Sequence, residues 1–124
     1  MIQTVAIAAG GAVGALMRFW ASRTVVAIMG TGFPYGTLIV NVSGSFLMGF
    51  LYVLLLERMS IAPEWRAALL IGVLGAFTTF STFSIETILL FEQGSAGKAV
   101  ANMLVSVLAC VVAAWFGVLG GRSL

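Results

Sequence analysis

Hydroxyl and aromatic side chains alternate in one run of the sequence that could carry chemistry. Residues 72–84 read Gly-Val-Leu-Gly-Ala-Phe-Thr-Thr-Phe-Ser-Thr-Phe-Ser. A single Ser or Thr in a helix often bonds back to its own backbone, so no one hydroxyl is diagnostic. A whole cluster exceeds what helix packing requires. Because hydroxyls donate hydrogen bonds, the run predicts a site that holds a hydrogen-bond acceptor.

Phe80 and Phe83 lie three residues apart and are expected on one helix face. An aromatic ring has a negative face and a positive edge. Ring edges beside the hydroxyls of Ser81, Thr82 and Ser84 would suit a small, partly dehydrated anion. The open alternative is that the pair is an ordinary packing contact, which is the usual role of buried Phe.

Two further segments carry polar residues at a spacing of four, which places each set on one helix face. The sets are Thr37, Asn41 and Ser45, and Asn102, Ser106 and Cys110. Burying an unpaired amide in hydrocarbon costs about 4–8 kcal/mol. Asn41 is therefore expected to face a pore or a partner helix, and stripes on neighbouring helices can line one narrow path.

Ionisable residues within apolar segments are few. Arg18 is a functional candidate by its position inside a segment, although an Arg near a helix end can instead extend to the headgroups. Glu86 marks a pore mouth or pairs with a neighbour. The chain has one cysteine and no histidine, which excludes Cys-His metal sites and His-based triads. No enzyme activity is predicted.

The amino-acid composition indicates that lipid, rather than water, surrounds most of the chain. Its 124 residues are 61% hydrophobic and 8% charged, with mean hydropathy +1.16, far from the usage of soluble domains. A net charge of +2 without a basic run excludes an ordinary nucleic-acid surface. The first four residues lack the positive region of a cleaved signal, so the first apolar segment is expected to remain as a membrane helix.

Four apolar segments match a bilayer core of about 30 Å, which takes roughly 20 helical residues. They cover residues 2–28, 33–56, 65–91 and 99–119. Since backbone groups in lipid must be paired within a segment, we predict an all-α, multi-pass membrane protein with a single four-helix domain over residues 1–124. The Gly10-x-x-x-Gly14 spacing predicts close helix packing.

The third segment is expected to break near mid-membrane. Gly75 is followed by β-branched Thr78 and Thr79, a combination that favours interruption of the helix. A break at this depth frees backbone carbonyls, which need a cation, water or a partner chain.

Charges beside the spans show no clear bias between the two sides. One side has Arg58, Arg66 and Arg122, and the other has Arg23 and Lys98, with Arg18 leaning towards it. Orientation normally follows an excess of Lys and Arg on the cytoplasmic side. Balanced charges favour insertion both ways, so that two oppositely oriented copies could pair. The alternative is one orientation set by a weak bias or by a partner.

Three motifs resemble those of the Fluc/CrcB fluoride channel family. Residues 11–19 read Gly-Ala-Val-Gly-Ala-Leu-Met-Arg-Phe, and residues 36–46 read Gly-Thr-Leu-Ile-Val-Asn-Val-Ser-Gly-Ser-Phe. The third motif is the hydroxyl-rich run that ends at residue 84. The resemblance covers the whole chain in order.

The resemblance implies a fluoride-selective channel for passive efflux of cytoplasmic fluoride through the cell inner membrane. It also implies a dual-topology, antiparallel homodimer. Phe80 and Phe83 would contact fluoride, Asn41 would bond near them, and a structural, untransported Na⁺ would be held by backbone carbonyls of Gly75 and Thr78. With the polar stripes, the candidate pathway comprises Phe80, Phe83, Asn41, Ser81, Thr82, Ser84, Thr37, Ser106 and Glu86.

Two other classes remain as alternatives. A proton-coupled exporter of the small multidrug resistance type needs a mid-membrane carboxylate in its first helix, and residues 2–17 contain none. In a non-conducting accessory subunit, the polar stripes would only bond helices together.

Overall fold

The computed structural model describes residues 1–124 and contains only helices. Four of them are long and apolar enough to cross a membrane, and they cover Ile2–Met29, Tyr35–Arg58, Pro63–Glu92 and Ala96–Arg122. The predicted all-α fold with four candidate spans is confirmed. The helices end a few residues away from the predicted spans, mostly beyond them.

The first two spans are joined by a short loop. Helix α1 (Ile2–Met29) ends at Gly30, whose φ of 82° suits glycine. Pro34 then precedes α2 (Tyr35–Val53), and α2 continues as the π-helical segment η1 (Leu54–Arg58). Met59 is extended and ends this span.

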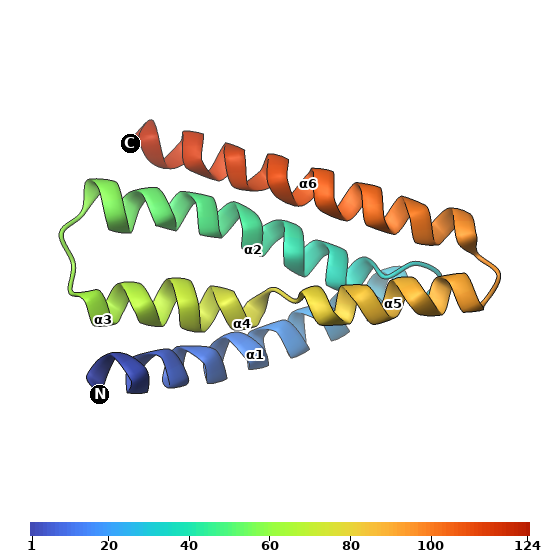
Figure 1. Ribbon diagram of the computed structural model, residues 1–124, viewed down its shortest axis with the longest axis horizontal. Coiled ribbons are helices and arrows are strands. Elements are labelled where there is room, and N and C mark those ends of the chain that lie inside the picture. The colour runs from blue at the N-terminus through green and yellow to red at the C-terminus, as the bar shows by residue number, and fades with distance from the viewer.

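The third span is discontinuous, as the sequence predicted. It begins with α3 (Pro63–Arg66), with Pro63 in the first turn, where its missing N–H is tolerated. The π-helical segment η2 (Ala67–Leu74) and α4 (Gly75–Phe77) follow. Thr78 and Thr79 are extended, with ψ of 157° and 122°. The helix resumes as α5 (Phe80–Glu92), and the interruption is visible as the thin yellow loop between α4 and α5 (Figure 1).

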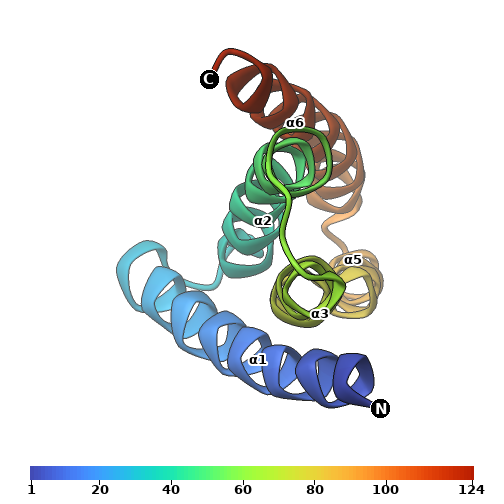
Figure 2. The same ribbon diagram turned by 90° about the vertical axis from the view of Figure 1, so that its left-hand side faces the viewer.

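The fourth span, α6 (Ala96–Arg122), follows a turn at Gly94. It packs along α2, while α1 packs along η2. Viewed nearly along the helices, α6 and α1 lie at opposite edges, with α2 and the third span between them (Figure 2). Both termini and α3 lie at the same end of the molecule (Figure 1). This arrangement puts α2 next to the interruption in the third span.

Glycines let these helices approach to backbone contact. A Cβ at Gly49 would overlap the carbonyl oxygen of Ala114, and one at Gly14 would overlap that of Val73. Gly10 also meets η2 through the carbonyl of Ala68. The predicted packing role of the Gly10-x-x-x-Gly14 pair is confirmed.

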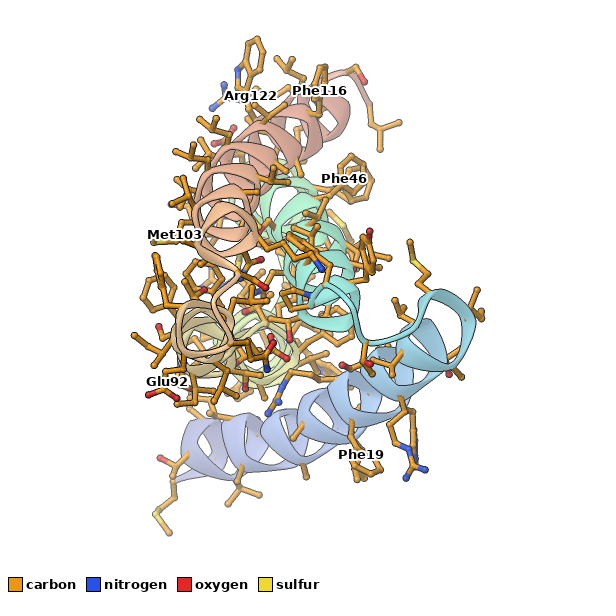
Figure 3. The ribbon with its side chains drawn as sticks, turned by 90° about the vertical axis from the view of Figure 1, so that its right-hand side faces the viewer. Phe19, Phe46, Glu92, Met103, Phe116 and Arg122 are labelled. Carbon is orange, nitrogen blue, oxygen red and sulfur yellow. The ribbon has the colours of Figure 1, made fainter.

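The outward faces of the helices are apolar. Phe19 on α1 and Phe116 on α6 point away from the neighbouring helices (Figure 3) and are about half exposed. Large exposed apolar side chains occur on every span. A surface of this kind is suited to lipid rather than water.

Adding a methyl group at Gly49 should separate α2 from α6. Gly49→Ala is expected to lower stability by about 1–3 kcal/mol, the usual cost of overpacking, measured as a lower melting temperature in detergent. Gly97→Ala is the matched control because nothing lies within 4 Å of its added Cβ. It should be neutral or stabilising, since Ala is the better helix former. Equal melting temperatures for the two variants would contradict the packing assignment.

Candidate functional site: the interrupted third span

The interruption is held by an amide side chain from α2. The backbone N–H of Thr79 donates to Asn41 Oδ1 at 2.7 Å, and Asn41 Nδ2 donates to the carbonyl of Thr79 at 2.9 Å. Asn41 thus pairs both polar groups of one residue whose helical partners are lost. The partner that this amide needs within the membrane is the main chain of Thr79.

Hydroxyls cap the two helix ends. Thr79 is the N-cap of α5, and its Oγ1 accepts from the N–H of Thr82 at 3.1 Å, which is the usual pairing at a Thr cap. On the other side of the break, Thr78 Oγ1 donates to the carbonyl of Leu74 at 3.0 Å. The predicted hydroxyl cluster therefore includes residues that build the break itself.

Two carbonyls lose their helical donors as a result. In a continuous helix the amides of Thr79 and Thr82 would donate to the carbonyls of Gly75 and Thr78, four residues back. Both amides instead donate to side-chain oxygens, Asn41 Oδ1 and Thr79 Oγ1, and no other main-chain bond outside the helices reaches these two carbonyls. Carbonyl oxygens are the ligand type that hard cations prefer.

Arg18 points into the protein. Its Nε donates to the carbonyl of Ala76, in α4, at 2.9 Å. Arg18 also lines a cavity of about 140 Å³ together with Ser22, Arg23, Thr37, Thr79 and Thr82. The side chain therefore bonds to the third span instead of extending to the headgroups.

Phe80 and Phe83 are in contact, but their environments differ. Their ring centroids are 5.3 Å apart with planes inclined by 46°. Phe80 is 75% exposed, whereas Phe83 is 7% exposed. In the single chain, Phe80 therefore presents its ring at the surface and Phe83 presents its ring to neighbouring helices.

Polar groups from three spans meet at a cavity of about 400 Å³ beside Phe80. Their residues are Asn41 and Ser45 of α2, Thr78 and Thr79 of the break, and Ser106 and Cys110 of α6. The structure thus brings together two residues of each predicted stripe and the first two hydroxyls of the run, whereas Thr37 and Asn102 lie outside this cavity. Apolar side chains such as Met48 and Val107 form the rest of the lining, and no charged group takes part.

A second polar cavity, of about 190 Å³, lies towards the end of the third span. It is lined by Ser22 of α1, Thr37 of α2 and Glu86 of α5, among others. One carboxylate oxygen of Glu86 is buried and has no hydrogen-bond partner. Thr37 and Ser22 line this cavity and the one beside Arg18, so the predicted mouth residue lies near the intramembrane arginine.

Two predicted hydroxyls lie outside these cavities. Ser81 is exposed, with its Oγ 3.4 Å from Thr79 Oγ1. Ser84 donates to the carbonyl of Phe80, in its own helix, at 2.9 Å, which is the local bond that a lone Ser commonly makes.

Thr87 is a polar residue of this region that the sequence motifs did not point to. This residue is buried and joins α5 to the α6 stripe, since Asn102 Nδ2 donates to Thr87 Oγ1 at 2.9 Å. Its position four residues after Phe83, on the same helix face, was the available signal.

Four apolar spans, with amide and hydroxyl groups gathered in cavities at a break in the third span, are the features of a membrane protein that admits a small polar solute into the bilayer. Residues 5–118 match the family model described as CrcB-like protein, Camphor Resistance (CrcB). The chain belongs to this family.

Several relatives carry the name fluoride-specific ion channel FluC. The chain is 57% identical over 119 residues to the one from Methylococcus capsulatus, covering 96% of this chain and 52% of that protein. It is 53% identical over 111 residues to the one from Shewanella amazonensis, covering 90% and 89%. It is 49% identical over 121 residues to the one from Magnetococcus marinus, covering 98% of each. The chain thus spans about half of the first relative and most of the others, and these relatives are named as channels, not enzymes.

Replacing Asn41 should loosen the break. Asn41→Leu leaves the N–H and the carbonyl of Thr79 unpaired, at about 1–3 kcal/mol for each buried group. We expect faster hydrogen exchange at residues 78–83 and a lower melting temperature. Ser45→Ala, one turn further along α2, is the control because its hydroxyl makes no bond across helices. Unchanged exchange in Asn41→Leu would contradict the pairing of Asn41 with Thr79.

Proposed function

We propose that this chain is a fluoride-selective ion channel that lets cytoplasmic fluoride leave the cell passively. The observation that carries the proposal is the cavity beside the break, where the Asn41 amide, hydroxyls and the Phe80 ring lie together without a charged group. The names of relatives that are 49–57% identical support the same ion. The proposed location is the cell inner membrane.

The physical task follows from the chemistry of hydrogen fluoride. The neutral acid crosses the bilayer, ionises at the higher pH inside and is trapped as an anion. A channel releases this anion down its gradient without energy input. Because fluoride holds water strongly, the path must replace hydration with donors, and a narrow path of hydroxyls, an amide and ring edges favours it over chloride.

Each pathway residue has a role in this proposal. The edges of Phe80 and Phe83 contact the ion. Asn41 has two N–H groups, of which one donates to Thr79 and the other remains for the ion. The hydroxyls complete the path, together with Glu86 at its mouth. They belong to Ser81, Thr82, Ser84, Thr37 and Ser106.

The working unit in this proposal is an antiparallel homodimer with dual topology. The exposed ring of Phe80 lies beside exposed Ser81 and the cavity to which Asn41 and Ser106 contribute polar groups. Polar groups at this depth are not left facing hydrocarbon, so a second copy that covers them would complete each path. The balanced flanking charges agree with insertion in both orientations.

The carbonyls of Gly75 and Thr78 would hold a structural Na⁺ at the centre of this dimer. They fit the ion because their helical donors have been taken by Asn41 and Thr79. The bound ion would supply positive charge that offsets these carbonyl dipoles. The chain's own residues fix the two carbonyls in place through the caps of the break.

Removing either ring should abolish fluoride flux. Phe80→Ile and Phe83→Ile keep an apolar side chain but lose the positive ring edge. Release of fluoride from liposomes, followed with a fluoride electrode, should fall to the level of empty liposomes while the dimer remains intact by size-exclusion chromatography. Phe116→Ile, on the outward face of α6 and away from the cavities that the pathway residues line, is the control and should conduct normally. Full flux in either pathway variant would refute the ring-edge role.

Withdrawal of Na⁺ should weaken the assembly. Replacing it with a large organic cation leaves the carbonyls of Gly75 and Thr78 without a partner in hydrocarbon, which is costly. We expect a larger monomer fraction by cross-linking and a lower fluoride flux, both restored when Na⁺ is returned. If dimerisation and flux stay the same when Na⁺ is replaced by the organic cation, a structural Na⁺ is ruled out.

A further inference from the structure

We propose that Asn102 is a selectivity-determining positioning residue, because it holds the hydroxyl hydrogen of Ser106 away from the cavity beside Phe80. Only a strong hydrogen-bond acceptor in the cavity then withdraws this hydrogen. The inference rests on the proposed fluoride function and concerns how the same path rejects weaker acceptors such as chloride.

The backbone of α5 determines which atom donates in each hydrogen bond between Ser106, Asn102 and Thr87. The carbonyl of Phe83 can only accept, and Thr87 Oγ1 lies 2.8 Å from it. The single hydrogen of Thr87 is therefore committed to Phe83. The oxygen of Thr87 can then only accept from its other neighbour, Asn102.

This requirement fixes the orientation of the Asn102 amide. Nδ2 faces Thr87 Oγ1 at 2.9 Å, so Oδ1 faces the other way. Ser106 Oγ lies 3.2 Å from Asn102 Oδ1, and since an amide oxygen cannot donate, Ser106 must. Every hydrogen along the chain thus points from the cavity towards α5.

Ser106 is the end of this chain at the cavity. It shares the cavity lining with Asn41, Thr79 and Phe80. Because its hydrogen points towards Asn102, Ser106 offers lone pairs to the cavity, which repel an anion. To bind an anion, the hydroxyl must rotate and leave Asn102 Oδ1.

Rotation of the Ser106 hydroxyl costs free energy because its hydrogen-bond partners are buried away from water. Asn102 is 2% exposed and Thr87 and Ser106 are nearly as buried, so no water replaces the lost bond. A buried acceptor left unpaired costs about 1–3 kcal/mol. The cost is the same for either halide, so it discriminates only through what each ion returns. Fluoride is the smallest halide and the strongest acceptor, so its bond to the hydroxyl offsets the cost and other steps then limit its flux. The diffuse charge of chloride does not offset it.

Without Asn102, the anion competes with a weaker acceptor for the hydroxyl hydrogen of Ser106. Ser106 would return to the backbone carbonyl four residues earlier, as Ser commonly does in helices. That carbonyl keeps its helical N–H donor when the hydroxyl leaves, so release costs less. The discrimination between fluoride and chloride therefore depends on the amide of Asn102 rather than on the Ser106 hydroxyl alone.

The test measures fluoride and chloride release separately from liposomes with wild-type protein, Asn102→Leu, Thr87→Val and Ser106→Ala. Asn102→Leu removes the competing acceptor. Thr87→Val keeps Asn102 and Ser106 but lets the amide turn its Nδ2 towards Ser106, so this nearly isosteric variant carries the test if Asn102→Leu fails to assemble. Both should raise the ratio of chloride to fluoride flux roughly tenfold, the factor that about 1.4 kcal/mol represents.

Ser106→Ala removes the donor and should lower fluoride flux without raising chloride flux. The control is Ser43→Ala, since Ser43 donates only to carbonyls of its own helix; its flux ratio should equal that of wild type. Equal falls of both ions in Asn102→Leu and Thr87→Val, or an unchanged ratio, would overturn the inference and leave Asn102 a packing residue. Absence of fluoride flux in the wild type would instead refute the proposed function.

Discussion

The structure depends on one constraint, that a peptide group within a membrane must be paired. At Thr79 the helix no longer supplies partners, and the amide of Asn41 replaces both of them. This pairing allows the third span to be interrupted without leaving the peptide of Thr79 unpaired in hydrocarbon. The caps of α5, the released carbonyls and the cavity beside Phe80 all follow from the same interruption.

Helix packing brings Asn41 to the place where it is needed. A Cβ at Gly44, one turn after Asn41 on the same face of α2, would overlap the side chain of Thr78. Glycine at this position therefore lets α2 approach the break closely enough for a short amide to reach it. The seam between α2 and α6 acts in the same way, because it places Ser106 of α6 at the cavity that Asn41 lines.

Local features of the sequence predicted much of this arrangement. Length and hydropathy predicted four spans, and Gly75 with the two threonines predicted the break. The need of Asn41 for a partner followed from the cost of burying an amide. The identity of its partner did not, because Thr79 is 38 residues away. The bond of Arg18 to the third span and the bond between Thr87 and Asn102 could not be predicted from the sequence either, because both depend on which helix faces meet.

The interruption also has an electrostatic consequence. Each peptide carries a dipole along its helix, so a helix ends in partial negative charge at its carboxyl end and partial positive charge at its amino end. At Thr78 and Thr79 the negative end of α4 meets the positive end of α5. Partial negative and partial positive charge therefore lie side by side at this break in the third span. None of the hydrogen bonds at the break involves a carboxylate, so this local field comes largely from groups that acid does not titrate.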